Sequence, residues 1–393
     1  MSLVSPDLAV VAGETSGDLL AAVVLNGLRA RHPNWVTAGI GGPAMVKHGF
    51  NAWWPSEKLA VRGYVEVLKH YREILGIRDG LQQKLLSQPP RLFMGVDAPD
   101  FNLKLEHALK SRGVPVVHFV CPSIWAWRPE RIEQLKASTN HVLCIFPFEP
   151  ALLAQAGIDA TYVGHPLAPL IPMAPDQSAA RIALGLPDGT PVVALLPGSR
   201  ASEVKYLLPR FLAAAAILLK QRPALQFVLP ALPALKTDID RLVSESGLAG
   251  AIRVVNGQSH TALAACDVTL IASGTATLEA ALFKRPMVIA YNMHWLSWLI
   301  MRRKQMQPWV GLPNILCREF VVPELLQEAA TPSALAAEVL AWFDAPERVA
   351  DVKQRFVSLH HTLMRDTVGL ACDVIDRLIT PATPAPALPT VSA

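Results

Sequence analysis

Residues 8–31 read LAVVAGETSGDLLAAVVLNGLRAR, and this stretch decides the fold. Its first five residues are small or branched and apolar, which predicts a strand buried on both faces, as in parallel sheets. A turn with two glycines follows, and residues 16–31 have the apolar spacing that is typical of a helix. A strand, a turn and a helix in this order form the repeating unit of a doubly wound α/β sheet.

The same unit recurs along the 393 residues. Continuous apolar runs separated by helical segments predict the further strands Val36–Ile40, Arg91–Val96, Val114–Val120, His141–Phe146, Thr161–Val163, Val192–Leu196, Gln226–Leu229, Ile252–Val255, Val268–Ala272 and Met287–Tyr291. A proline-rich stretch that begins at Gly164-His165-Pro166 predicts a linker. We therefore expect an α/β protein of two Rossmann-like domains that face a cleft, residues 1–168 and 169–380, with C-terminal helices in the second and a disordered tail at 381–393.

Composition narrows the class of function. Hydrophobic residues make up 51% and charged residues 17% of the chain, and the formal net charge is +4. This balance suits a large core and shows no basic and aromatic pattern for nucleic acid. The five scattered cysteines and the lack of metal-ligand spacing indicate a reducing compartment, no metal and no cofactor. The first residues do not resemble a signal peptide, and the longest apolar run is too short to span a bilayer, so we expect a cytoplasmic location, free or on a membrane surface.

Three loops in the first half follow predicted strands, where ligands of open α/β sheets bind. The loop Ala12–Asp18 either presents backbone N–H groups to an anion or is a tight turn in which Ser16 caps the helix. Asp97 lies directly after a strand and is placed to act as a general base, or else it forms the turn. The third loop carries Trp125, Trp127 and Arg128, which suit a sugar or lipid platform or interdomain packing.

Two strand-to-helix turns in the second half predict a diphosphate site. The first is formed by Gly198, Ser199 and Arg200, where glycine permits close approach and arginine adds a bidentate phosphate donor. The second offers amides and hydroxyls from Ser273, Gly274, Thr275 and Thr277. Glu279, one turn further on, is suited to accept hydrogen bonds from ribose hydroxyls, or it only complements the helix dipole.

Two helical segments combine an apolar face with basic residues. On the first, the apolar residues that share one face are Val67, Leu68, Tyr71, Ile74 and Leu75. The second, His294–Gln307, places tryptophans ahead of three consecutive basic residues. Such patterns occur both on core helices and on helices at a membrane surface, and we predict that the first contacts membrane or acyl chains.

Nine short segments, in order along residues 8–375, resemble the lipid-A-disaccharide synthase family. They are AGETSGD (12–18), GIGGPAM (39–45), GYVEVL (63–68), VDAPDFN (96–102), PSIWAWR (122–128), GHPL (164–167), PGSR (197–200), SGTATLE (273–279) and PNIL (313–316). Each segment alone is weakly specific, whereas the ordered set is highly specific. Pro129 after WAWR and the Pro/Ala-rich tail depart from the family pattern.

The resemblance implies a GT-B fold and a metal-independent inverting transfer from a UDP-diacylglucosamine donor to a lipid monosaccharide phosphate acceptor. It implies Asp97 as the base with Glu14 as the alternative, contact of Glu14 and Ser16 with the acceptor, and Asn314 in the nucleotide site. The expected place is the cytoplasmic face of the inner membrane, as a peripheral protein, and a homodimer is left open. Three alternatives also stay open: a lipid-linked muramyl-peptide glycosyltransferase, a UDP-sugar 2-epimerase and a non-enzymatic nucleotide-binding protein.

Overall fold

The structure is a computed structural model that describes residues 5–59, 64–126, 128–293, 298 and 306–380; of Thr15 and residues 64–71 it describes the backbone alone. The contacts divide the chain into two compact units. The first comprises Met1–Pro166 together with Arg365–Ala393, and the second comprises Leu167–Met364. None of the described helices combines the length and the apolar character needed to cross a membrane.

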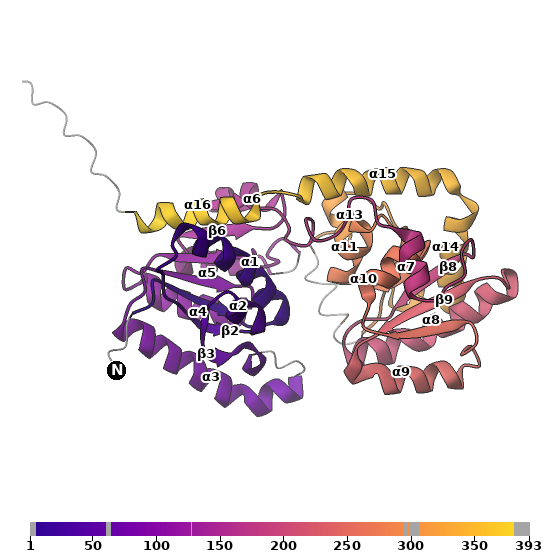
Figure 1. The fold of residues 1–393 in the computed structure, drawn as a ribbon, viewed down its shortest axis with the longest axis horizontal. Coiled ribbons are helices and arrows are strands. Elements are labelled where there is room, and N and C mark those ends of the chain that lie inside the picture. Colours follow the sequence, from indigo (N-terminus) through magenta and orange to yellow (C-terminus); the bar gives the residue numbers. More distant parts are fainter. Residues whose placement is uncertain (1–4, 60–63, 127, 294–297, 299–305, 381–393) are drawn as a thin grey trace, which may run out of the picture. The chain divides into compact units, whose positions relative to one another are not determined.

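The first unit, in which Figure 1 labels β2, β3 and β6, is built on a parallel sheet of seven strands. Their order is β3-β2-β1-β4-β5-β6-β7. The strands are β1 (Leu8–Ala12), β2 (Thr37–Gly41), β3 (Asn51–Pro55), β4 (Leu92–Val96), β5 (Val116–Phe119), β6 (His141–Cys144) and β7 (Ala160–Tyr162). The central strands β1 and β4 are fully buried, as their apolar runs predict. The chain winds from β1 toward β3 in one direction and from β4 toward β7 in the other, which is the doubly wound order.

Helices cover both faces of this sheet. They are α1 (Thr15–Arg31), α2 (Pro43–Lys47), α3 (Tyr64–Ser87), α4 (Pro99–Lys110), α5 (Arg131–Ser138), α6 (Glu149–Gln155) and α16 (Thr367–Ile379), with a 3₁₀ turn at Ser56–Lys58. Figure 1 shows α3 and α16 on opposite sides of the sheet. The second half of α3 supplies Ile77, Leu81 and Leu85 to the core, and Ile74 packs against the same cluster. For Ile74 this differs from the expected lipid-facing position, because the helix covers the sheet. The side chains of Val67, Leu68 and Tyr71 lie outside the described residues.

The last helix belongs to the first unit, whereas the sequence predicted that it would follow the second domain. Gly27 of α1 lies so close to Val368 of α16 that a side chain at position 27 would overlap it. At the end of α1, Arg31 donates to Asp373 at 2.7 Å and to Asp376 at 3.0 Å. A small residue on α1 and these ion pairs therefore hold α16 against the first sheet.

The second unit repeats the design with six parallel strands in the order β10-β9-β8-β11-β12-β13. They are β8 (Val192–Leu196), β9 (Gln226–Ala231), β10 (Ile252–Asn256), β11 (Val268–Ala272), β12 (Met287–Tyr291) and β13 (Glu324–Leu326). Its helices are α7 (Gln177–Ala183), α8 (Ala201–Gln221), α9 (Pro233–Glu245), α10 (Ser259–Ala265), α11 (Thr275–Leu282), α13 (Leu312–Cys317), α14 (Pro332–Asp344) and α15 (Pro346–Leu363), with a 3₁₀ turn at Gln327–Ala329. Every strand expected from an apolar run is present in the two sheets, and β3 and β13 at their edges are additional.

Candidate functional site

Each sheet has one point where the winding direction reverses, between β1 and β4 in the first unit and between β8 and β11 in the second. Ligands of open α/β sheets bind outside the carboxyl ends of the strands at such a point. Glu14 and Asp97 follow β1 and β4, while Arg200 and Gly274 follow β8 and β11. The sheet order therefore brings the predicted residues together in pairs, one pair in each unit.

At the first reversal point the two loops touch. A side chain at Gly13 would place its Cβ 3.3 Å from the Cβ of Ala98, so the loops after β1 and β4 are in close contact. Glu14 is the N-cap residue of α1, but its side chain makes no capping hydrogen bond. Ser16 is exposed within the first turn of α1, so it does not serve as the helix cap.

Asp18 links two of the sequence segments that follow neighbouring strands. Asp18 is only 3% exposed, and its carboxylate accepts the N–H groups of Gly42 at 2.8 Å, Ala44 at 2.9 Å and Met45 at 3.1 Å. Three charge-assisted hydrogen bonds to one buried carboxylate fix the loop after β2 against α1. Asp18 is thus a structural residue of the site wall, a role that the sequence analysis did not assign.

Asp97 lies in a strained turn at the end of β4. Its φ of 50° and the φ of 43° at Ala98 are both left-handed, which costs free energy for residues with a side chain. The Asp97 N–H donates to the Phe119 carbonyl at 2.8 Å, and its own carbonyl accepts from Asn102 Nδ2 at 2.8 Å. The half-buried side chain is therefore presented at the sheet edge by a backbone clamped on both sides, as is common at functional sites.

Trp125 anchors the loop after β5, because its side chain is buried and not exposed to a ligand. Trp125 is 8% exposed, packs edge-on against Phe146 and Phe148, and donates from Nε1 to Glu149 at 3.0 Å. Burial raises the pKa of Glu149 to about 8, although the hydrogen bonds from Phe146 and Trp125 act to lower it. Packing therefore describes Trp125 better than an exposed sugar platform does. Trp127 lies outside the described residues.

Arg128 and Asp100 connect the loops after β5 and β4. Arg128 Nη1 lies 3.7 Å from Asp100 Oδ1, and Arg131 donates to the same oxygen. Arg128 remains partly exposed and lies beside the turn that carries Asp97. It is therefore a cation at the edge of the first reversal point.

In the second unit, the turn after β8 already holds a carboxylate of the protein itself. Glu203 accepts the backbone N–H groups of Ser199 at 3.0 Å and Arg200 at 3.2 Å, and its other oxygen accepts from Arg200 Nη1 at 2.9 Å. Gly198 has a φ of 118°, and a side chain there would overlap Glu203. In the turn that the sequence assigned to phosphate, the backbone N–H groups of Ser199 and Arg200 are thus taken up by Glu203, the third residue of α8, whereas the Arg200 side chain stays 60% exposed.

The turn after β11 is more open. Gly274 is exposed, has a φ of 150°, and precedes the first residue of α11, Thr275. Ser273 donates to the Val310 carbonyl at 3.1 Å, and the buried Thr277 hydroxyl donates to the Gly274 carbonyl at 2.8 Å. Two of the predicted hydroxyl groups therefore shape the turn, and Gly274 and Thr275 are exposed and accessible to a ligand.

Glu279 is paired with His260, a residue that the sequence analysis missed. The His260 Nε2 lies 3.2 Å from Glu279 Oε2, and this hydrogen bond and charge raise the pKa of His260. His260 is the second residue of α10, which comes directly after the strand β10 and a short turn. A polar residue shortly after a strand could have indicated His260 as a site residue, but nothing in the sequence linked it to Glu279.

Asn314 faces inward. Its amide donates to the Val322 carbonyl at 2.9 Å and to Glu324 at 2.8 Å, and its oxygen accepts the Val322 N–H at 3.0 Å. Glu324 in turn accepts the N–H groups of Val310 and Gly311, each at 2.9 Å. The structure thus assigns Asn314 to holding the loop beside Ser273, through an edge strand that the sequence analysis did not predict.

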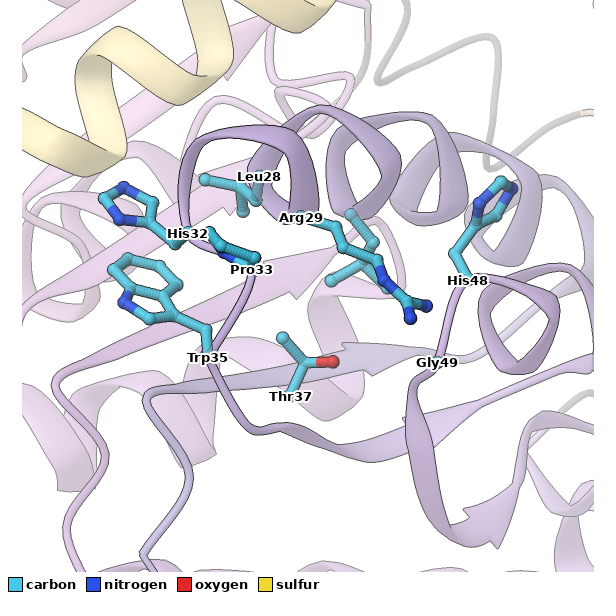
Figure 2. A pocket seen from close by; sticks show the side chains of 9 residues that line it. Leu28, Arg29, His32, Pro33, Trp35, Thr37, His48 and Gly49 are labelled. Atoms are coloured by element: carbon cyan, nitrogen blue, oxygen red, sulfur yellow. The ribbon is translucent and has the colours of Figure 1, made fainter.

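A separate hollow of about 130 Å³ lies elsewhere in the first unit. Figure 2 shows it lined by Arg29, His32 with Trp35 beside it, and His48. The lining includes Thr37, the first residue of β2, so the hollow lies at the amino ends of the strands, away from Asp97. Within the described parts of the chain, no three acidic, histidine or cysteine side chains are grouped closely enough to hold a metal ion.

Comparison with solved structures defines the class of protein. The chain is similar to a UDP-GlcNAc 2-epimerase from Neisseria meningitidis bound to UDP-GlcNAc, with a TM-score of 0.64, 12% identity, and coverage of 94% of this chain and 99% of the other. It is also similar to a UGT transferase from Siraitia grosvenorii in complex with UDP, with a TM-score of 0.61, 13% identity, and coverage of 95% and 99%. These likenesses, together with the two doubly wound sheets, show the GT-B fold.

Sequence comparison then gives the family. A family model described as lipid-A-disaccharide synthetase matches residues 8–368. The lipid-A-disaccharide synthase of Albidiferax ferrireducens is 62% identical over 377 residues, and that of Verminephrobacter eiseniae is 58% identical over 377 residues; each match covers 95% of this chain and 97% of the relative. The chain belongs to the lipid-A-disaccharide synthase family of glycosyltransferases, which decides against the alternatives that the sequence left open. Membership implies a nucleotide-sugar donor and a lipid-linked acceptor.

Proposed function

We propose that the chain transfers 2,3-diacylglucosamine from its UDP donor to O6 of 2,3-diacylglucosamine 1-phosphate, which forms a β-1,6 linkage with inversion and releases UDP. Family membership over residues 8–368 supports the substrates. The observation that carries the mechanism is the clamped, left-handed turn that presents Asp97 at the reversal point of the first sheet.

Asp97 acts as the general base. The acceptor O6 attacks the anomeric carbon, its proton passes to the Asp97 carboxylate, and the bond from that carbon to the diphosphate oxygen breaks as UDP leaves. A positioned base contributes about 10²–10⁴-fold to such a step. Glu14, at the end of the neighbouring strand β1, is the second candidate for this role, and Ser16 lies with it on the acceptor side.

The second unit binds UDP at its own reversal point. The exposed guanidinium of Arg200 and the backbone at Gly274–Thr277 stabilise the charge that develops on the leaving diphosphate, without a metal. Glu279 accepts hydrogen bonds from the ribose while His260 holds its other side. Because Glu203 already accepts the N–H groups of Ser199 and Arg200, the diphosphate contacts this turn through the Arg200 side chain.

The acceptor and the acyl chains lie on the first unit, at the cytoplasmic face of the inner membrane. Leu19 on α1 is 56% exposed and Val46 on α2 is 49% exposed, on the two helices that Asp18 ties together. Exposed aliphatic side chains next to a lipid-binding site are suited to contact acyl chains. Arg128 is placed to bind the acceptor phosphate.

The test is Asp97→Asn compared with Asp351→Asn, an exposed acid on α15 of the second unit. Incubation with both lipid substrates, followed by mass spectrometry, should show loss of the tetraacyl disaccharide only in Asp97→Asn, while calorimetry shows unchanged UDP binding in both. Arg200→Ala and Glu279→Ala should each weaken UDP binding by about ten- to a hundredfold, since a hydrogen bond to a charged group is worth roughly 1.5–3 kcal/mol. Near-normal turnover in Asp97→Asn would move the base role to Glu14.

A further inference from the structure

Directly behind Asp97 lies a cluster of polar side chains that the proposed chemistry does not use. Asn102 and Glu106 are one helical turn apart on α4, and His118 is on β5; all three are fully buried. His118 Nδ1 and Glu106 Oε1 are 2.7 Å apart. Burial disfavours the cation of His118, but the charge of Glu106 and its hydrogen bond outweigh this effect and raise the pKa of His118, to which the charge of Asp97 also contributes.

The sheet makes room for this cluster through Gly95. Gly95 is the register partner of His118 on the neighbouring strand. A Cβ at Gly95 would lie 3.1 Å from Asn102 Cγ and would overlap the Glu106 carboxylate. The two helix side chains therefore sit directly over the backbone of Gly95, two residues before Asp97, in a space that only glycine leaves open.

The cluster is not the arrangement that stability alone favours. Asn102 Oδ1 and Glu106 Oε2 have no hydrogen-bond partner among the described residues. A buried polar atom without a partner costs free energy, and apolar side chains of similar size are often at least as stable as a buried ion pair. The polar residues thus require an explanation other than packing.

The contacts of Asn102 supply that explanation. Its Nδ2 donates to the carbonyl of Asp97 at 2.8 Å and lies 3.4 Å from the carbonyl of Val96. Asp97 and Ala98 both have left-handed backbone angles, and such residues persist only where the surrounding structure holds them. Asn102 holds this turn, Glu106 packs with Asn102 over Gly95, and His118 fixes Glu106.

We infer that Asn102, Glu106 and His118 form a positioning network that holds Asp97 in its left-handed turn and aims its carboxylate at the acceptor hydroxyl. This inference rests on the proposed role of Asp97 as the base. The three residues do not touch the reacting atoms and act through the backbone of Asp97. A base that is displaced by about 1 Å loses on the order of 10²-fold in rate, so the network affects the chemical step more than substrate binding.

The test uses the full chain with both lipid substrates. Glu106→Gln keeps the size of the side chain but removes the charge that pairs with His118, and Asn102→Asp keeps the size but removes the donor to the Asp97 carbonyl. Each should lower kcat by about 10–100-fold with little change in either KM, while UDP binding to the second unit stays the same. Val117→Ala is the matched control, because Val117 is buried in β5 next to His118 but alternates to the other face of the sheet.

Each outcome decides the matter. A loss of kcat in Glu106→Gln and Asn102→Asp but not in Val117→Ala, measured well below every melting temperature, supports the network. Normal kcat in either folded network variant with Asp97→Asn inactive, or an equal loss of kcat in Val117→Ala, overturns the network and leaves the base role intact. Activity in Asp97→Asn overturns both. If Glu106→Gln fails to fold, Asn102→Asp alone decides.

Discussion

Replacement of Gly198 by alanine tests whether the turn after β8 serves the nucleotide. Gly198 has a φ of 118°, which side chains rarely adopt, and the new Cβ would lie 2.5 Å from the Cβ of Glu203. Relief of this overlap requires Glu203 to move, which releases the N–H groups of Ser199 and Arg200 that it now accepts. The substitution therefore acts on the backbone, on the helix cap and on the orientation of Arg200 at once.

The expected magnitude follows from these contacts. Unfavourable backbone angles cost about 1–3 kcal/mol, and loss of a helix cap costs about 0.5–2 kcal/mol, so the free energy of unfolding should fall by roughly 2–4 kcal/mol. UDP affinity should fall about ten- to a hundredfold, because Arg200 loses the carboxylate that orients it.

Urea unfolding and calorimetric titration with UDP measure the two effects. Gly189→Ala is the control: its φ of 73° is also left-handed, but among the described residues other than its two chain neighbours no atom lies within 4 Å of the added Cβ. It should lose about 1–2 kcal/mol of stability and keep its UDP affinity. If folded Gly198→Ala binds UDP as tightly as the unaltered chain, the turn after β8 is not part of the nucleotide site.

Two further predictions concern stability of the first unit. Asp18→Asn should lower the free energy of unfolding by about 1–3 kcal/mol, because an amide nitrogen would face an N–H group that the carboxylate now accepts. An unchanged urea midpoint would contradict the role of Asp18 as an anchor. Burial lowers the pKa of His165 to about 4, from an ordinary value of 6.5. The unfolded chain therefore binds a proton at His165 more readily than the folded one, so the stability that the neutral ring provides is present above pH 6.5 and is lost as the pH falls toward 4, by about 3 kcal/mol. Urea unfolding between pH 4 and 7 should show a shallower pH dependence for His165→Gln than for the unaltered chain, and an unchanged slope would contradict this prediction.

Two strands at the edges of the sheets were not predicted from the sequence. Strands in the middle of a parallel sheet are buried on both faces and are therefore continuous apolar runs, as in Leu8–Ala12 and Val192–Leu196. Asn51–Pro55 and Glu324–Leu326 lie at sheet edges and are only partly buried, so no such run marks them. The second omission matters for the site, since Glu324 on that strand holds Asn314 and the loop beside Ser273.

The sequence by itself determined the class of fold, because the alternation of buried strands and helices depends on the local apolar pattern. It also determined the strand ends at which the candidate site residues lie, because a turn after a parallel strand lies at the carboxyl edge of the sheet. The tertiary structure alone decided where the side chains point. Glu203 accepts an N–H group of the turn that was assigned to phosphate, the buried Trp125 donates to Glu149, and α16 belongs to the same unit as the first sheet. The partners differ widely in their distance along the chain: Glu203 accepts the Arg200 N–H three positions earlier, Trp125 donates to Glu149 24 positions later, and Asp376 on α16 pairs with Arg31 345 positions earlier. A pattern of residue types identifies groups able to pair, but only packing selects which of them do.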